Sequence, residues 1–450
     1  MLPKDFQWGF ATAAYQIEGA VDQDGRGPSI WDTFCAQPGK IADGSSGVTA
    51  CDSYNRTAED IALLKSLGAK SYRFSISWSR IIPEGGRGDA VNQAGIDHYV
   101  KFVNDLLDAG ITPFITLFHW DLPEGLHQRY GGLLNRTEFP LDFENYARVM
   151  FRALPKVRNW ITFNEPLCSA IPGYGSGTFA PGRQSTSEPW TVGHNILVAH
   201  GRAVKAYRDD FKPASGDGQI GIVLNGDFTY PWDAADPADK EAAERRLEFF
   251  TAWFADPIYL GDYPASMRKQ LGDRLPTFTP EERALVHGSN DFYGMNHYTS
   301  NYIRHRSSPA STTPSATSTC SSPTSRATAS APRRSPPLAP VRPAATSWCG
   351  SARGTYPPIY VTENGTSIKG ESDLPKEKIL EDDFRVKYYN EYIRAMVTAV
   401  ELDGVNVKGY FAWSLMDNFE WADGYVTRFG VTYVDYENGQ KRSPRRAQRA

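Results

Sequence analysis

The sequence is poor in cysteine and has no long hydrophobic run. Its five cysteines are scattered and without CxxC spacing, at Cys35, Cys51, Cys168, Cys320 and Cys349. An odd, scattered set argues against a disulfide framework and against a zinc knuckle. No apolar run approaches the length of a membrane span, and the first six residues lack the hydrophobic segment of a signal peptide. We therefore expect a cytoplasmic protein without a membrane partner.

The sequence also lacks a strong excess of charge and several catalytic motifs. The formal net charge is −4 over 450 residues, which gives no reason to expect nucleic acid as a partner. No HExxH spacing occurs, and no nucleophile elbow surrounds Ser414. We therefore expect neither a metal nor an organic cofactor. Hydrophobic residues make up 40% of the chain. At this length they can form the buried core of one large barrel or of two ordinary domains.

Short apolar segments alternate with helical periodicity along the chain. The predicted strands are residues 8–18, 72–80, 113–121, 160–166, 220–225, 292–298, 359–365 and 409–421. Helices are predicted after Thr57, with a capping box at its start and a stop at Gly68, then over 96–107, 141–154, 192–207, 240–254 and 383–402. Eight strands in this alternation predict an α/β fold, a closed (β/α)8 barrel. The alternative is a doubly wound open sheet, but the glycine-rich stretch 173–177 leads into a loop and not into a dinucleotide-binding helix.

The ends of the predicted strands carry amides, a histidine, tyrosine and tryptophan around two glutamates. These residues are Gln16, Glu18, Arg73, Trp78, His119, Trp120, Asn164, Glu165, Asn296, Tyr298, Glu363, Trp413, Glu420 and Trp421. Planar hydrogen-bonding groups suit hydroxyls and aromatic faces suit the apolar face of a ring, so this mixture favours an uncharged sugar. Taken singly, His119 could be a core histidine, and Trp413 and Trp421 could be packing residues.

Glu165 closes the fourth strand and Glu363 closes the seventh, so two carboxylates face each other across one barrel mouth. A facing pair is the minimal machinery for cleaving a glycosidic bond. A separation of about 5–5.5 Å would allow direct attack with retention of configuration, whereas roughly 6.5–9.5 Å would admit a water and cause inversion. The sequence leaves both outcomes open.

Several blocks together resemble glycoside hydrolase family 1, the β-glucosidases, in their fungal intracellular type. The blocks are Thr162-Phe163-Asn164-Glu165-Pro166, Val361-Thr362-Glu363-Asn364-Gly365, the N-terminal stretch 6–19 and Asn418-Phe419-Glu420-Trp421. Residues 72–80, 117–121 and 296–298 match as well. The resemblance covers most of residues 5–306 and 355–440.

The resemblance implies a role for each site residue. Glu165 is the expected acid/base and Glu363 the expected nucleophile, supported by Arg73. Residues expected to bind substrate are Gln16, His119, Trp120, Asn164, Asn296, Tyr298, Trp413, Glu420 and Trp421, and those expected at the aglycone entrance are Leu167, Cys168 and Pro172. Glu420 would repel a phosphate, so the glycone should be unphosphorylated.

The implied activity is that of a cofactor-free, retaining β-glucosidase. Its expected substrates are small molecules with a terminal β-glucosyl residue, such as cellobiose, short cello-oligosaccharides and aryl or alkyl β-glucosides. The alternative, a non-catalytic sugar-binding barrel, would apply if an anomalous segment in the chain misplaced Glu363.

That segment, residues 307–353, contains no Asp, Glu, Lys, Ile, Phe or Tyr. Such a composition cannot bury enough apolar surface to order itself. It stands where the sixth crossover helix is expected, and residues 442–450 stand where a C-terminal helix is expected. We interpret both as coding sequence read out of frame within a single barrel domain of residues 1–450; a genuine flexible insertion or nucleic-acid-binding arm is the alternative.

Overall fold

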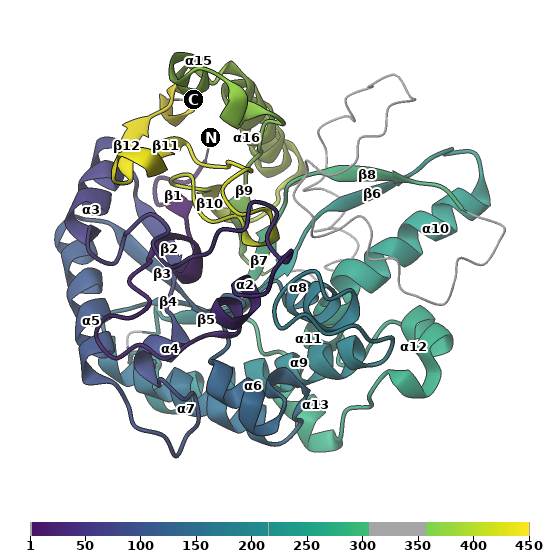
Figure 1. Ribbon diagram of the computed structural model, residues 1–450. Coiled ribbons are helices and arrows are strands. Elements are labelled where there is room, and N and C mark those ends of the chain that lie inside the picture. The colour runs from purple at the N-terminus through teal and green to yellow at the C-terminus, as the bar shows by residue number, and fades with distance from the viewer. Residues whose placement is uncertain (1, 215, 306–356, 450) are drawn as a thin grey trace.

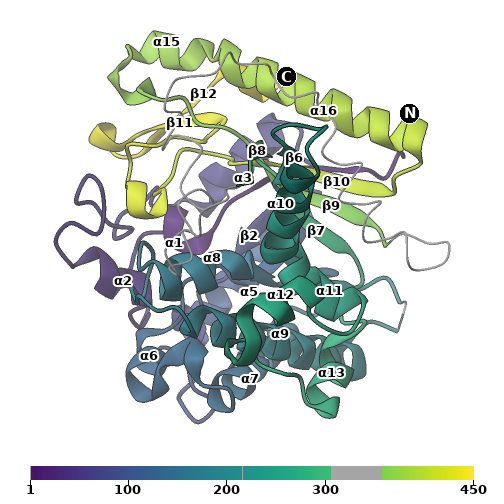
Figure 2. The same ribbon diagram turned by 90° about the vertical axis from the view of Figure 1, so that its right-hand side faces the viewer.

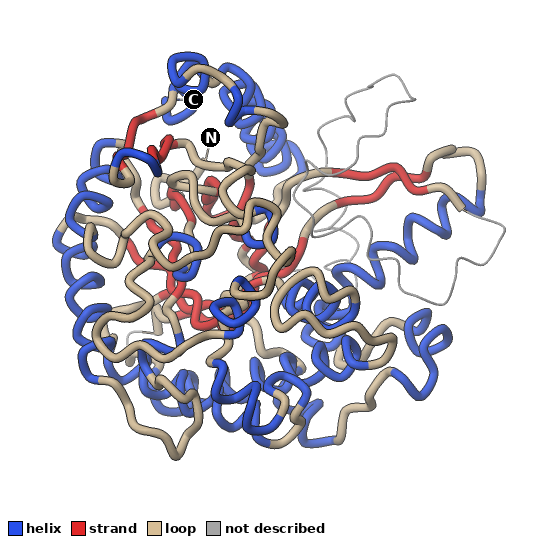
Figure 3. The backbone as a smooth tube through the Cα atoms, viewed as in Figure 1, coloured by secondary structure: helices blue, strands red, loops and turns tan. Residues whose placement is uncertain are grey.

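The computed structural model describes residues 2–214, 216–305 and 357–449. Its centre is a closed barrel of parallel strands, which occupies the middle of Figure 3 and follows the order β1-β10-β9-β7-β5-β4-β3-β2. The strands are β1 (Gln7–Ala11), β2 (Ser71–Ser75), β3 (Thr112–Phe118), β4 (Asn159–Asn164), β5 (Gln219–Asn225), β7 (Tyr293–Asn296), β9 (Ile359–Asn364) and β10 (Val407–Trp413). The predicted (β/α)8 barrel is confirmed, and the open sheet is excluded.

Helices surround the barrel, as Figures 1 and 2 show. The longer ones are α3 (Thr57–Ser66), α5 (Gln93–Asp108), α7 (Glu138–Ala153), α9 (Glu188–Ala206), α10 (Pro237–Leu247) and α16 (Asp383–Asp403). Shorter ones are α1 (Ala14–Ile17), α2 (Ile30–Cys35), α4 (Trp78–Ile81), α6 (Glu124–Tyr130), α8 (Pro166–Ala170), α11 (Trp253–Tyr259), α12 (Ala265–Leu271), α13 (Pro280–Val286) and α15 (Lys376–Glu381). Among the described helices, none has the length and apolar character needed to cross a membrane.

Some predicted boundaries were wrong for local reasons. Thr57 is the first residue of α3 and not its cap, so the predicted capping box is absent, although Gly68 does follow the helix end with a φ of +70°. The capping boxes are instead at Ser29 and Thr279, before α2 and α13. The predicted helix 240–254 is interrupted by a π-helical turn at Glu248–Ala252. The predicted first, second and eighth strands end earlier, because their last residues leave the sheet.

Aromatic side chains fill the inside of the barrel below the carboxyl ends of its strands. The ring of Phe114 on β3 lies 5.3 Å from that of Tyr360 on β9 and 4.9 Å from that of Phe411 on β10. Phe292, just before β7, lies 5.3 Å from Tyr360. Tight packing here leaves the carboxyl ends of the strands as the place where polar side chains can meet a ligand.

Two small sheets lie outside the barrel. One pairs β6 (Phe228–Pro231) with β8 (Ser300–Ile303), and the other pairs β11 (Thr432–Asp435) with β12 (Lys441–Pro444). Beyond β10, the described residues form 3-10 turns and this second sheet, and they contain no α-helix, as predicted. The predicted low-complexity segment 307–353 and the sixth crossover helix fall outside the described residues.

Candidate active site

Asn296 connects the ends of the two strands that carry the glutamates. It pairs in register with Glu363 at the β7–β9 ladder, and its Nδ2 donates to Glu165 Oε1 at 2.9 Å and to Asn164 Oδ1 at 3.0 Å. The hydroxyl of Thr362 donates to Asn296 Oδ1 at 2.7 Å, which fixes which way the amide points. The predicted pair of glutamates therefore does meet at one end of the barrel.

Glu363 is held at both of its oxygens. Arg73 Nη1 donates to Oε1 at 2.5 Å, and the hydroxyl of Tyr298 donates to Oε2 at 2.5 Å. Arg73 is completely buried and also donates to Asn164 Oδ1 at 2.6 Å. Charge-assisted bonds of this kind favour the ionised form of a carboxyl group and fix its orientation.

The two carboxyl groups differ in how easily each loses its proton. Burial, and next the charge of Glu363, raises the pKa of Glu165 to about 8. Burial also raises the pKa of Glu363, but the Arg73 charge and the bonds from Tyr298 and Arg73 oppose that rise. The charge of Arg73 and the hydrogen bonds to Glu363 therefore favour the state in which Glu363 is ionised and Glu165 carries the proton.

Three site residues have left-handed backbone conformations. The φ angles are +43° at Glu165, +73° at Trp120 and +50° at Trp421. A non-glycine residue pays roughly 1–3 kcal/mol for such a conformation, and these residues tend to cluster at active sites. Glu165 turns the chain out of β4 directly into α8, with Pro166 as the first helical residue. After this turn the Glu165 carboxyl group accepts its hydrogen bond from Asn296 at the end of β7.

A second group of predicted residues forms an aromatic and amide wall. The rings of Trp120 and Trp421 lie 4.8 Å apart, and His119 stacks on Trp413 at 5.9 Å and on Trp421 at 6.0 Å. Trp421 also packs on Trp31 at 4.6 Å, so it serves the core as well as the wall. The structure thus brings together all the residues predicted to bind substrate.

Buried polar atoms in this wall lack partners among the described residues. They are Gln16 Oε1, His119 Nδ1 and Glu420 Oε2. Burial and the Arg73 charge lower the pKa of His119 well below its usual range, so the ring is neutral. Its Nε2 lies 3.0 Å from Asn164 Nδ2, which can only donate, so the ring proton is on Nδ1. Buried polar groups without partners are costly, and a hydroxyl-rich ligand would satisfy them.

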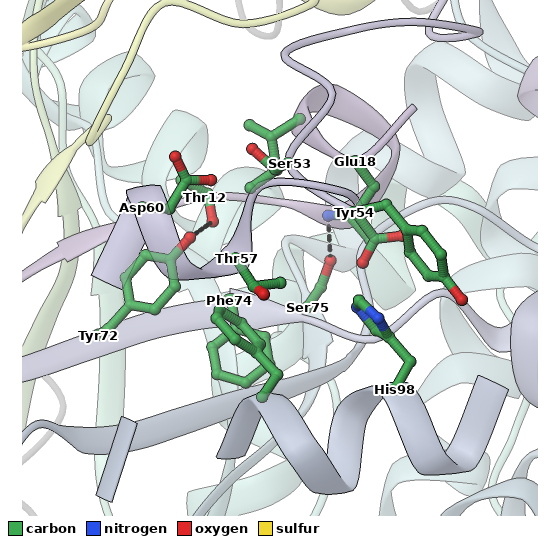
Figure 4. A pocket seen from close by; sticks show the side chains of 13 residues that line it. Thr12, Glu18, Ser53, Tyr54, Thr57, Asp60, Tyr72, Phe74, Ser75 and His98 are labelled. Atoms are coloured by element: carbon green, nitrogen blue, oxygen red, sulfur yellow. Dashed lines mark hydrogen bonds between the residues drawn. The ribbon is translucent and has the colours of Figure 1, made fainter. Parts of the chain in front are cut away.

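Two strand-end residues on the predicted list have structural roles. Glu18 accepts hydrogen bonds from Arg80 Nε at 2.8 Å and from the Tyr99 hydroxyl at 2.6 Å. It lines a cavity of about 20 Å³, with Tyr54 and His98 beside it (Figure 4), and neither Glu165 nor Glu363 belongs to the lining of this cavity. Trp78 is completely buried and stacks on Tyr146 at 4.8 Å. Both residues lie beyond the last strand residue of β1 or β2, so alternation along a strand no longer predicts their direction.

The residues predicted for the aglycone entrance follow Glu165 directly. Leu167 and Cys168 lie on α8, and Pro172 lies on the π-helical turn Ile171–Gly175. All three are buried, and Cys168 Sγ lies 3.1 Å from Glu165 Oε2. Cys168 thus lies beside the acid/base candidate, while the contact of all three residues with an aglycone stays a prediction.

Some contributing residues were missed from the sequence. Thr362 orients Asn296, and Asn418 accepts a hydrogen bond from Gln16 Nε2 at 2.9 Å. The hydroxyl of Tyr388 on α16 donates to the backbone oxygen of Tyr298 at 2.9 Å. Thr362 and Asn418 lie inside the matched motifs, which was an available signal. Tyr388 lies on a helix face with ordinary helical spacing, so no sequence signal marked it. Within the described ranges, no cluster of metal-binding side chains occurs.

Buried carboxyl groups that share one proton, beside a wall of indoles and amides at the mouth of a barrel, define a glycoside hydrolase. The family model described as "Glycosyl hydrolase family 1" matches residues 1–449. The chain belongs to this family, and the resemblance found in the sequence is confirmed.

Three relatives illustrate the similarity. "Beta-glucosidase 1B" of Phanerodontia chrysosporium is 53% identical over 456 residues, which cover 99% of this chain and 84% of the relative. The crystal structure of β-glucosidase 2 from the fungus Trichoderma reesei, in complex with Tris, has a TM-score of 0.93 and 88% identity, and the match covers 100% of this chain and 97% of that one. A mutant rice β-glucosidase, in a covalent complex with Glc, has a TM-score of 0.91 and 41% identity, with coverage of 100% and 97%.

Proposed function

We propose that the chain is a retaining β-glucosidase that removes terminal, non-reducing β-D-glucosyl residues. The observation that carries the proposal is the division of roles in the carboxyl pair. Glu165 is protonated and can act as an acid, whereas Arg73 and Tyr298 hold Glu363 in its ionised form. Cellobiose, short cello-oligosaccharides and aryl or alkyl β-glucosides are the proposed substrates, and the β-glucosidase relatives support this choice.

In the first step, a carboxylate oxygen of Glu363 attacks the anomeric carbon of the substrate. The glycosidic bond breaks, and its electron pair stays on the leaving oxygen, which takes the proton of Glu165. The product is a glucosyl ester of Glu363. Arg73 stays in place to stabilise the carboxylate before attack and its partial charge in the transition state.

In the second step, water attacks the anomeric carbon from the side that the aglycone has left. Glu165, now ionised, takes one proton from this water, and the ester bond to Glu363 breaks with its electrons returning to the carboxylate. The first product sugar is β-glucose, because two inversions restore the configuration. Glu165 is then protonated again, and the enzyme is ready for another cycle.

Two observations favour retention over inversion. The same amide of Asn296 contacts Glu165 and also lowers the pKa of Glu363 through a hydrogen bond, so a single small group spans the two carboxyl groups. Inversion would need roughly 6.5–9.5 Å between them to accommodate a water. The covalent complex of the rice relative with Glc supports an intermediate of the proposed type.

The surrounding residues are assigned to the glucosyl unit. Asn164 would bind the 2-hydroxyl, while Gln16, His119 and Glu420 would bind the remaining hydroxyls through atoms that have no hydrogen-bond partner in the described part of the chain. Trp413 would lie under the sugar ring, with Trp421 and Trp120 at its edge. Burial, and next the charges of Asp423, Glu363 and Glu165, raise the pKa of Glu420 well above its usual range. The same negative charges would repel a phosphate, which supports an unphosphorylated glycone.

The wider setting follows from the substrates. Hydrolysis of cellobiose would place the enzyme at the end of cellulose degradation. The resemblance to the fungal intracellular type supports a cytoplasmic location, which cell fractionation with an activity assay would test. The proposed catalytic domain spans residues 1–450, with 307–353 as an anomalous segment inside it.

The configuration of the first product tests the proposal. We expect the purified chain to hydrolyse p-nitrophenyl β-glucoside and cellobiose, and proton NMR during the first turnovers to show β-glucose before mutarotation. Initial α-glucose would contradict the double displacement. Glucose binding without hydrolysis would instead favour the non-catalytic alternative, which the family membership does not favour.

A further inference from the structure

The loop from Ser414 to Glu420 carries part of the sugar-binding wall but belongs to no strand. Asn418 Oδ1 and the backbone oxygen of Phe419 both accept from Gln16 Nε2 at 2.9 Å. Glu420 ends the loop, and Trp421 begins a 3-10 turn. A segment without a sheet ladder needs other contacts to hold its side chains in position.

Asp417 anchors the middle of this loop. It is completely buried, and Arg445 donates to both of its oxygens, at 2.8 and 3.1 Å. Arg428 Nη1 donates to Oδ2 at 2.7 Å, and the backbone nitrogens of Gly430 and Val434 donate at 3.0 and 3.3 Å. The carboxylate is therefore fully bonded, one residue before Asn418.

Arg445 belongs to the C-terminal stretch that the sequence suggested was out of frame. It is completely buried, and its Nη2 also lies 3.1 Å from Glu371 Oε1. Arg385 on α16 pairs with Glu371 at 2.6 Å and with Asp382 at 3.0 Å. The cluster thus balances three acids with three arginines, counting Arg428. Removing one arginine would leave an uncompensated buried charge next to the loop.

We propose that Arg445 is a positioning residue for glycone binding, acting through Asp417 on the loop 414–420. Its loss shifts Asn418 and Glu420 and so releases Gln16, while Glu165, Glu363 and Arg73 keep their places on other elements. The C-terminal stretch is then part of the substrate-binding apparatus although it contacts no substrate. This inference rests on the proposed function.

Arg446 provides a matched control one residue away. Its ion pair with Asp383 at 2.5 Å is exposed on both sides, with 64% and 76% of the side chains accessible. Such a surface pair contributes little. Arg446→Met therefore removes the same charge and shape at the next position, without touching the buried cluster.

The test compares Arg445→Met with Arg446→Met on two substrates. p-Nitrophenyl β-xyloside lacks the hydroxymethyl group of the glucoside and with it the 6-hydroxyl, one of the hydroxyls that Gln16, His119 and Glu420 are proposed to bind. We expect Arg445→Met to raise KM and lower kcat/KM for the glucoside by about 10- to 100-fold, to affect the xyloside less, and so to reduce the ratio of the two kcat/KM values. Arg446→Met should keep both values and their ratio.

A loss of folded protein with an unchanged substrate ratio would overturn the positioning role and leave a purely structural one. If Arg445→Met does not fold, Arg445→Lys replaces it, because lysine keeps the charge but cannot bond both oxygens of Asp417. A lowered ratio in Arg445→Lys supports the role, and a preserved ratio contradicts it. A wild-type chain inactive on both substrates would instead contradict the proposed function.

Discussion

The catalytic pair and the loop 414–420 are held in place by different means. Glu165 directly follows β4 and Glu363 lies on β9; the Glu165 backbone nitrogen donates to the Val223 oxygen on β5 at 2.9 Å, and the Glu363 backbone oxygen accepts from the His297 nitrogen at 2.9 Å. The loop is part of no ladder; it is held by separate backbone hydrogen bonds, such as those to Ala11 and Thr432, and by the Asp417 carboxylate, which accepts hydrogen bonds from Arg445 and Arg428. The catalytic carboxyl groups are thus positioned through the barrel strands, whereas the part of the sugar-binding wall on the loop 414–420 is held by residues distant in the sequence.

The largest expected effect comes from the strand-borne nucleophile. Glu363→Gln removes the attacking carboxylate, and we expect kcat to fall by at least about 10⁴-fold, as for loss of a covalent nucleophile in other enzymes. Steady-state assays on p-nitrophenyl β-glucoside measure this. Glu18→Gln is the matched control, since Glu18 is also buried and paired with an arginine, and its turnover per folded molecule should be retained. Equal losses in both variants would contradict the assignment.

The second effect depends on the leaving group. Glu165→Gln removes the acid, so hydrolysis of cellobiose should slow by about 10²- to 10⁴-fold. Formation of the glucosyl ester from a dinitrophenyl glucoside, whose leaving group needs no proton, should change much less. Azide, which attacks without a base, should restore turnover of that substrate and give β-glucosyl azide. A uniform loss on all substrates, without azide rescue, would argue against the acid/base role.

The third effect is a shift in pH dependence. In the free enzyme, kcat/KM should fall at high pH as Glu165 loses its proton, near pH 8, and at low pH as Glu363 gains one. Arg73→Met removes the cation that keeps the pKa of Glu363 down, so the acid limb should move to higher pH by about 1–3 units. Arg80→Met, which leaves the active site untouched, should keep the limb in place. If the acid limb of the kcat/KM profile stayed in place in Arg73→Met, Arg73 would not be what stabilises the ionised form of Glu363.

The smallest effect concerns the orientation of Asn296. Thr362→Val preserves shape but removes one hydrogen bond, so kcat/KM should fall only about 2- to 10-fold. Thr12→Val is a suitable control, because the Thr12 hydroxyl bonds Tyr72 at 2.6 Å outside the site. If the Thr362 variant behaved like the Thr12 variant, the strand ladder alone would suffice to place the amide.

The sequence predicted residues at the strand ends better than residues in the loops. A short apolar run followed by a polar residue predicts a buried strand whose last side chain lies at the mouth of the barrel. Glu165, Glu363, Asn296 and His119 were all found in this way. Residues in loops were not, since Glu18 and Trp78 turn away once their strands have ended. Asp417 and its partner Arg445, 28 residues apart in sequence, follow no periodicity. The composition of 442–450 even suggested coding sequence read out of frame, and Arg445 lies in this stretch.

The central claim, that Glu363 forms a covalent glucosyl ester, has a direct test. A 2-deoxy-2-fluoro-β-glucosyl fluoride should glycosylate Glu363 slowly with loss of fluoride, and the resulting ester should hydrolyse more slowly still, because the fluorine at C2 destabilises both charged transition states while fluoride is a good leaving group. Peptide mass mapping of the trapped wild-type protein should then find one fluoroglucosyl group on the peptide that contains Glu363. A label on Glu165 or elsewhere, or turnover without any trapped ester, would contradict the account.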